Sequence, residues 1–126
     1  MNYLGRHIIL DLFDCPATLL KDPDEVHAIM KAGALAMKAT IVEEAFHHFS
    51  PDGVSGVIII KESHLTIHTW PEHNYAAVDI FTCGNMQMDA GLDYLVKAFR
   101  CGRSDLRELK RGEGIVGTTD RTINVD

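Results

Sequence analysis

Hydrophobic and polar positions alternate along this chain in short runs that end at turn residues, which is the pattern of a sheet with sequential strands. Turn signals occur at "SPDG" and at "PEHN", where Asn74 tolerates the left-handed conformation. A run of β-branched residues in 54–61 is typical of a buried strand. The pattern predicts strands over residues 3–13, 40–49, 54–61, 61–70 and 75–82 and a short edge strand over 105–111.

Two further segments have apolar residues at helical spacing. The first follows "KDPDE", where Asp22 can cap a helix, Pro23 suits its first position and Glu25 lies three residues after the cap. Its apolar face comprises Val26, Ile29, Met30, Gly33 and Met37. The second helix carries Leu92, Leu95, Val96 and Phe99, with a cap expected near Asp89. These elements predict an α+β two-layer sandwich, an antiparallel sheet with two helices packed on one face.

Length and charge narrow the class of protein. The 126 residues fit one domain, 1–126, and a chain of this size gains stability from a partner subunit. A net charge of −6 argues against non-specific nucleic-acid binding, and no apolar run reaches the ~20 residues that span a bilayer. The polar end after Gly112, Gly114 and Gly117 predicts a loose tail.

The three cysteines, Cys15, Cys83 and Cys101, form no CxxC motif. We therefore expect neither a disulfide framework nor a zinc ribbon, and a reduced cytoplasmic setting fits best. A cysteine in this context is usually a small buried hydrophobe.

The stretch "KESHLTIHTW", residues 61–70, concentrates groups that can move protons, and four interpretations compete for it. His64, His68 and His73 with Glu72 could bind a metal, although their spacing mixes strand faces. Ser63 could be a hydrolase nucleophile, although it lacks a GxSxG elbow. The polar residues could also be merely hydrogen-bonded at a strand end.

The fourth interpretation is a self-processing serine. Attack of the Ser63 hydroxyl on the Glu62 carbonyl would convert the peptide into an ester, and loss of the Ser63 α-proton would then expel the Glu62 carboxylate. The dehydroalanine left behind would hydrolyse to a pyruvoyl group. This chemistry needs a hydroxyl, an oxyanion donor and a base, for which Ser63, Ser55 and His68 are candidates.

The run "GVSGVIIIKESHLTIHTWPEHNYAAVDIFTCG" resembles the processing region of the short bacterial and archaeal S-adenosylmethionine decarboxylase proenzymes. "LGRH" and "FHHFSPDGVSG" are also similar to that family, and the resemblance extends over about residues 3–100. It implies a pyruvoyl-dependent lyase that forms the aminopropyl donor for spermidine and CO2 from S-adenosylmethionine. It further implies a homodimer of αβ units and no metal.

The resemblance also implies roles for individual residues. Cleavage between Glu62 and Ser63 would give a β chain, 1–62, and an α chain, 63–126, headed by the pyruvoyl group that forms a Schiff base with the substrate. His68 would be the processing base and Ser55 an assisting hydroxyl. Cys83 would be the catalytic proton donor, since a thiol is mostly protonated near neutral pH.

Substrate contacts are expected from aromatic faces, which attract a cationic sulfonium and stack on adenine. Phe46, Phe49 and Trp70 are the candidates for this contact. Glu72 could bind ribose hydroxyls, while His64 and Leu65 would line the pocket just after the cut. Two alternatives remain, a pyruvoyl-dependent arginine or ornithine decarboxylase and an unprocessed paralogue that binds and regulates a partner.

The spacing of Ser63 and His68 conflicts with these roles. The two residues are five positions apart, so a regular strand places them on opposite faces. The sequence therefore predicts a bend or bulge near Ser63 that would let His68 reach it.

Overall fold

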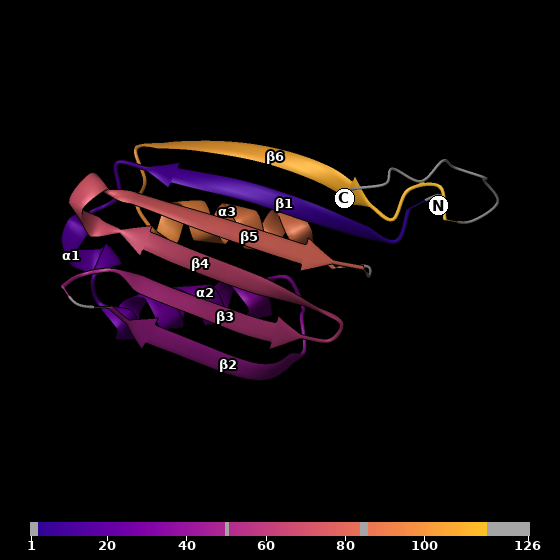
Figure 1. Ribbon diagram of the computed structural model, residues 1–126, viewed down its shortest axis with the longest axis horizontal. Helices are drawn as coiled ribbons and strands as arrows, with labels where there is room; N and C mark the ends of the chain where they lie inside the picture. Colours follow the sequence, from indigo (N-terminus) through magenta and orange to yellow (C-terminus); the bar gives the residue numbers. More distant parts are fainter. Residues whose placement is uncertain (1–2, 50, 84–85, 116–126) are drawn as a thin grey trace, which may run out of the picture.

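Six antiparallel strands form one sheet in the order β2-β3-β4-β5-β1-β6 (Figure 1). The computed structural model describes residues 3–49, 51–83 and 86–115. The strands are β1 Gly5–Phe13, β2 Ile41–His48, β3 Val54–Ile60, β4 Ser63–Trp70, β5 Tyr75–Thr82 and β6 Arg103–Arg111. The helices are α1 Ala17–Leu20, α2 Pro23–Ala36 and α3 Met88–Ala98, with a 3-10 turn, η1, at Pro71–His73.

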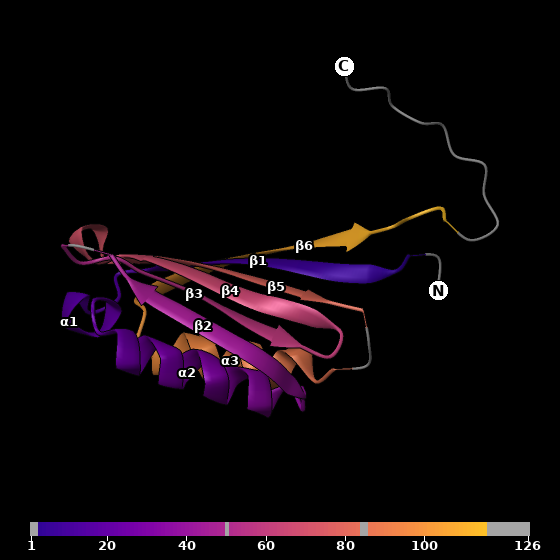
Figure 2. The same ribbon diagram turned by 60° about the horizontal axis from the view of Figure 1, so that its bottom comes forward.

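The helices α2 and α3 lie side by side on one face of the sheet, which Figure 2 shows in profile. This arrangement confirms the predicted α+β sandwich. None of the described helices is long and apolar enough to cross a membrane.

Alternation along each strand separates a buried face from an open face. In β5 every second residue, from Ala76 through Thr82, is buried against the helix layer. The other strands contribute to the same core, which includes Ile8, Leu10, Leu12, Ile58, Ile60, Leu65, Ile67, Met30 and Leu95. The intervening strand residues lie on the face turned away from the helices, which we call the open face.

Helix α2 begins as its sequence predicts. The Asp22 carboxylate accepts hydrogen bonds from the backbone N–H groups of Asp24 and Glu25, at 3.0 and 3.3 Å, which satisfies donors that the first helical turn leaves unpaired. At Gly33 the helix packs closely on α3, because a Cβ there would lie 2.7 Å from Leu95 Cδ2. The predicted apolar face therefore fixes the contact between the two helices.

Three features differ from the sequence prediction. Helix α1 was not expected, because four residues are too few to show helical periodicity, yet Leu19 and Leu20 anchor it in the core. Helix α3 is capped at Gln87, without a side-chain hydrogen bond, and Asp89 lies in its first turn instead. Strand β6 begins at Arg103 rather than at residue 105, and it is exposed throughout, as an edge strand should be. The predicted tail beyond Ile115, including Gly117, lies outside the described residues.

An ion pair joins α2 to the edge strand β2. His27 Nε2 lies 2.5 Å from Glu44 Oε1, and Lys31 Nζ lies 3.7 Å from the other carboxylate oxygen. The hydrogen bond to His27 is the main cause that lowers the pKa of Glu44, and Lys31 adds to it. The ionised carboxylate is therefore favoured in the folded state.

Replacing this carboxylate should have a pH-dependent effect on stability. A carboxyl group whose pKa is lowered by folding stabilises the protein above its unfolded pKa and loses that contribution as the pH falls. We expect Glu44→Gln, made in a Ser63→Ala chain so that the expected cleavage cannot occur, to lower the free energy of unfolding by about 0.5 kcal/mol at pH 7. The difference should shrink below pH 4.5, the ordinary glutamate value. Urea unfolding at pH 7 and pH 3 tests this, and an equal loss at both values would contradict it.

Candidate functional site

The first group of reactive side chains lies where the start of β4 meets the end of β5. His64 pairs with Phe81 in the ladder between these strands. Ser63, which precedes His64, therefore lies close to Cys83, which comes two residues after Phe81. The Ser63 hydroxyl donates to the Glu62 carbonyl oxygen, and the Cys83 thiol donates to the same oxygen at 3.0 Å. Ser63 Oγ lies 3.7 Å from Cys83 Sγ. We call Glu62, Ser63 and Cys83 the cleavage cluster.

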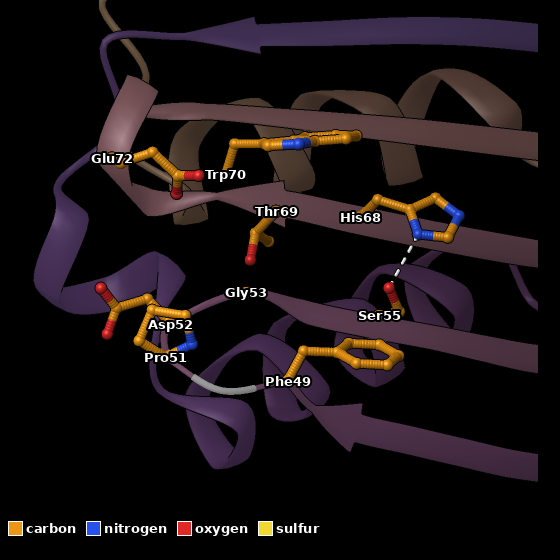
Figure 3. A pocket seen from close by; sticks show the side chains of 9 residues that line it. All are labelled: Phe49, Pro51, Asp52, Gly53, Ser55, His68, Thr69, Trp70 and Glu72. Carbon is orange, nitrogen blue, oxygen red and sulfur yellow. Dashed lines mark hydrogen bonds between the residues drawn. The ribbon is translucent and has the colours of Figure 1, made fainter.

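The second group lies on β3 and β4. Ser55 and His68 are directly opposite each other in the β3–β4 ladder, and both side chains lie on the open face. Ser55 Oγ and His68 Nδ1 are hydrogen-bonded at 2.8 Å (Figure 3). We call these two residues the Ser55–His68 pair.

These two groups are at opposite ends of β4. Ser63 and His68 are five positions apart along β4, which corresponds to about 16 Å. The ladders of β4 with β3 and β5 show no register shift, and the bulge in the sheet lies in β2 between Ile41 and Glu43. The predicted bend near Ser63 is therefore wrong, and His68 does not reach Ser63 of its own chain.

A cavity of about 540 Å³ opens beside the Ser55–His68 pair. Figure 3 shows Phe49 and Trp70 on its two sides, with the carboxylates of Asp52 and Glu72 at one end. Its lining consists of Phe49, Pro51, Asp52, Gly53, Ser55, His68, Thr69, Trp70 and Glu72. Three of the predicted substrate contacts, Phe49, Trp70 and Glu72, are thus brought together.

The other predicted substrate contacts lie elsewhere. The Phe46 ring stacks on His27 of α2 with centroids 4.3 Å apart, so it belongs to the helix side of the sheet. The Leu65 side chain is buried in the core. His64 lies on the open face with its ring edge against Phe81, near the cleavage cluster rather than the cavity. None of these three lines the 540 Å³ cavity.

Sequence reasoning missed several residues of these two regions. Asp52 was assigned only to a turn, although its position just before "GVSG" was a signal that the turn adjoins Ser55. On the open face near the cleavage cluster, His7 Nε2 lies 3.2 Å from Asp79 Oδ1. The motif "LGRH" contained this histidine, but only the register of β1 on β5 shows where it lies.

The histidines of the metal hypothesis have other partners or positions. Among the described residues, no three His, Cys, Asp or Glu side chains are grouped closely enough to hold a metal ion. His68 is bonded to Ser55 and His64 faces Phe81, while His73 lies in η1.

The three cysteines differ in exposure and reactivity. Burial raises the pKa of the Cys15 thiol to about 12 and also raises the pKa of Cys101. Cys83, by contrast, is exposed within the cleavage cluster. Thiol chemistry near neutral pH is therefore expected at Cys83.

Comparison with known proteins shows the family of this chain. The S-adenosylmethionine decarboxylase family model matches residues 6–112. An S-adenosylmethionine decarboxylase proenzyme of Acidithiobacillus ferrooxidans is 49% identical over 114 residues, covering 90% of this chain and 86% of that protein. The proenzyme of Carboxydothermus hydrogenoformans is 53% identical over 114 residues, with 89% of each chain covered.

A solved structure from this family has the same fold. The crystal structure of the adenosylmethionine decarboxylase from Aquifex aeolicus superposes with a TM-score of 0.81 at 28% identity, covering 99% of this chain and 100% of that one. The chain belongs to the S-adenosylmethionine decarboxylase family, which confirms the resemblance inferred from its motifs.

The exposure of Cys83 predicts selective alkylation. With iodoacetamide near pH 7.5 we expect Cys83 to be labelled first and Cys15 to react at least ~100-fold more slowly than an ordinary thiol, because burial and a raised pKa both deplete its thiolate. Peptide mass spectrometry over a time course measures this, with Cys83→Ser as the control. Labelling of Cys15 ahead of Cys83 would contradict the assignment.

Proposed function

We propose that this chain is a self-processing, pyruvoyl-dependent decarboxylase that converts S-adenosylmethionine into CO2 and the aminopropyl donor used for spermidine. The observation that carries the proposal is the cleavage cluster. Ser63 directs its hydroxyl at the carbonyl of the peptide bond that family resemblance marks for cleavage, and Cys83 contacts the same oxygen. The proposed products are chains 1–62 and 63–126 of a single domain.

Each residue of the cluster has a defined task in this proposal. Ser63 Oγ attacks the Glu62 carbonyl carbon, and the hydrogen bond from Cys83 stabilises the charge that develops on the oxygen. The peptide C–N bond breaks to leave an ester, after which a base takes the Ser63 α-proton and the Glu62 carboxylate leaves. Water hydrolyses the dehydroalanine through its imine, which releases ammonia and leaves the pyruvoyl group. The pyruvoyl group formed at residue 63 supplies a carbonyl that accepts the electron pair left by CO2.

Cys83 has a second task after cleavage. Its sulfur lies 3.7 Å from Ser63 Oγ, so it is next to the position at which the substrate would be held. From there the thiol can deliver the proton that replaces CO2 on the substrate α-carbon. The exposure of Cys83 allows the thiol to be reprotonated from solvent.

The processing base must come from a second copy of the chain. His68 is about 16 Å along β4 from Ser63 of its own chain, whereas facing sheets pack only about 10 Å apart. Ser63 is the first residue of β4, and its hydroxyl meets Cys83 at an exposed end of the strand. If the open faces of two copies pack with two-fold symmetry, the Ser55–His68 pair of one copy can reach this end, and with it the cleavage cluster, of the other. Two identical sites then form per dimer, as expected of an isologous interface.

The cavity supports a nucleoside substrate in the same assembly. Phe49 and Trp70 can stack on adenine and attract the sulfonium cation, and Glu72 can accept hydrogen bonds from ribose hydroxyls. Its volume of about 540 Å³ lies within the range of small-molecule sites. The unpaired cysteines fit a reduced compartment, and the proposed location is the cytoplasm.

A second candidate is a decarboxylase of arginine or ornithine. The specific observation in its favour is the carboxylate pair Asp52 and Glu72 at one end of the cavity, which could bind a guanidinium or an amine. The aromatic walls favour the nucleoside.

Mass spectrometry should detect the cleavage directly. We expect the purified protein to contain two fragments divided between Glu62 and Ser63, the second without a free amine, and we expect Ser63→Ala to remain whole. Release of CO2 from S-adenosylmethionine should exceed release from arginine or ornithine by at least ~100-fold, since neither amino acid has an adenine for Phe49 and Trp70 or ribose hydroxyls for Glu72. A wild-type chain that stays whole on long incubation would instead favour a regulatory, partner-binding paralogue.

Complementation between two inactive variants tests the shared site. A His68→Ala chain retains Ser63 but should stay whole alone, and a Ser63→Ala chain cannot be cut but retains His68. When the two are co-expressed with different tags, random pairing should let about half of the His68→Ala copies be cleaved. Adding His68→Ala to the Ser63→Ala chain is the matched control and should abolish the rescue. Absence of cleavage in the mixture would contradict a base supplied by the second copy.

A further inference from the structure

Thr69 is a buried polar residue directly behind the Ser55–His68 pair. It is 5% exposed and follows His68 in β4, with its side chain on the helix side of the sheet. Its hydroxyl accepts a hydrogen bond from the Val54 backbone N–H at 2.9 Å and donates one to the Leu20 carbonyl at 2.8 Å. Because it both donates and accepts, its orientation is fixed.

The two hydrogen bonds of Thr69 connect β4 to the start of β3 and to the end of α1. Val54 is the first residue of β3 and directly precedes Ser55, while Leu20 is the last residue of α1. The ladder between β3 and β4 ends at Ser55 opposite His68. The Thr69 hydroxyl therefore holds the start of β3 just beyond the last pair of the ladder.

The surrounding backbone leaves little room for an alternative. A Cβ on Gly53 would lie 3.2 Å from the Thr69 carbonyl oxygen, so the chain approaches β4 closely at this point. The Gly53 carbonyl in turn accepts from the Phe49 N–H at 2.6 Å, closing the loop that carries Phe49, Pro51 and Asp52. The close approach of Gly53 to Thr69 therefore also orients the loop that lines the cavity.

We infer that Thr69 is a positioning residue for the reaction, whose hydroxyl sets the distance between Ser55 and His68 and the placement of the Phe49 loop. This inference rests on the proposed function. Without the hydroxyl, the Val54 N–H and the Leu20 carbonyl would lose their partner in a buried place, and β3 would shift or fray at its first residue. Ser55 would then no longer be held at 2.8 Å from His68.

Two substitutions separate the hydroxyl from the shape of the side chain. Thr69→Val keeps the branched shape and removes both hydrogen bonds, whereas Thr69→Ser keeps the hydroxyl. We expect Thr69→Val to slow cleavage at Glu62–Ser63 by at least ~10-fold and Thr69→Ser to remain within ~3-fold of the wild type, with the rate followed by intact mass. Equal rates for Thr69→Val and the wild type would overturn the inference.

A merely structural role is distinguished by two further measurements. Ile80→Val in β5 also alters the buried face but contacts neither Ser55 nor His68, so it should lower the thermal midpoint without slowing cleavage. In a double-mutant cycle, adding Thr69→Val to Ser55→Ala should slow cleavage little beyond Ser55→Ala alone, because both act through one hydrogen bond. Multiplied effects in the double variant, or an equal slowing by Ile80→Val, would overturn the inference.

A spectroscopic measurement on the Ser55–His68 pair gives a result that does not depend on how much of each variant folds. In whole chains carrying Ser63→Ala, the ¹⁵N chemical shift of His68 Nδ1, which reports its hydrogen bond to Ser55, should change with Thr69→Val, and Thr69→Ser should restore it. An unchanged His68 Nδ1 signal in Thr69→Val would overturn the inference. A wild-type chain that never cleaves would refute the proposed function itself, whereas normal cleavage of Thr69→Val refutes only the role of Thr69.

Discussion

The register of β3, β4 and β5 determines where every reactive group lies. Pairing Ser55 with His68 places one proton-transfer pair at one end of β4, and pairing His64 with Phe81 places Ser63 beside Cys83 at the other. A slip of one residue in either ladder would move these side chains to the opposite face of the sheet. Because core residues such as Leu65 and Ile67 alternate with His64 and His68, the hydrophobic core and the chemistry enforce the same register.

The two faces of the sheet have different tasks. The helix side is filled by alternating aliphatic residues and closed by α2 and α3, and this side supplies the core of a small domain. The open face carries Ser55, His68, Trp70 and His7, and none of the helices in the described part of the chain covers it. A chain of this length gains from covering such a face, and a second copy would do so while completing the proposed site. Stability and reaction are thus linked to the same surface.

The strands, the first long helix and the family could be predicted from the sequence. Alternation over residues 54–82 and the cap at Asp22 determined the strands and the first long helix, and long motifs around Ser63 and Cys83 indicated the family. Sequence reasoning could not predict spatial pairing across the sheet, so it required a bend to bring His68 to Ser63 when the strand is regular. Phe46 shows the same limit. The sequence places this aromatic residue next to "HHF", but its position in the alternation of β2 turns its ring toward His27 on the helix side of the sheet.

The distance between the Ser55–His68 pair and the cleavage cluster has a consequence for activation. An isolated chain holds the nucleophile Ser63 and the thiol Cys83 against the Glu62 carbonyl, but its own His68 is about 16 Å away. If the base is supplied across the interface as proposed, cleavage requires prior pairing, so the backbone stays whole until both copies are folded. The chain would otherwise be cut between β3 and β4, its central hairpin, before the sheet had formed. The proposed placement of the base on a second copy would therefore protect folding by making cleavage depend on assembly.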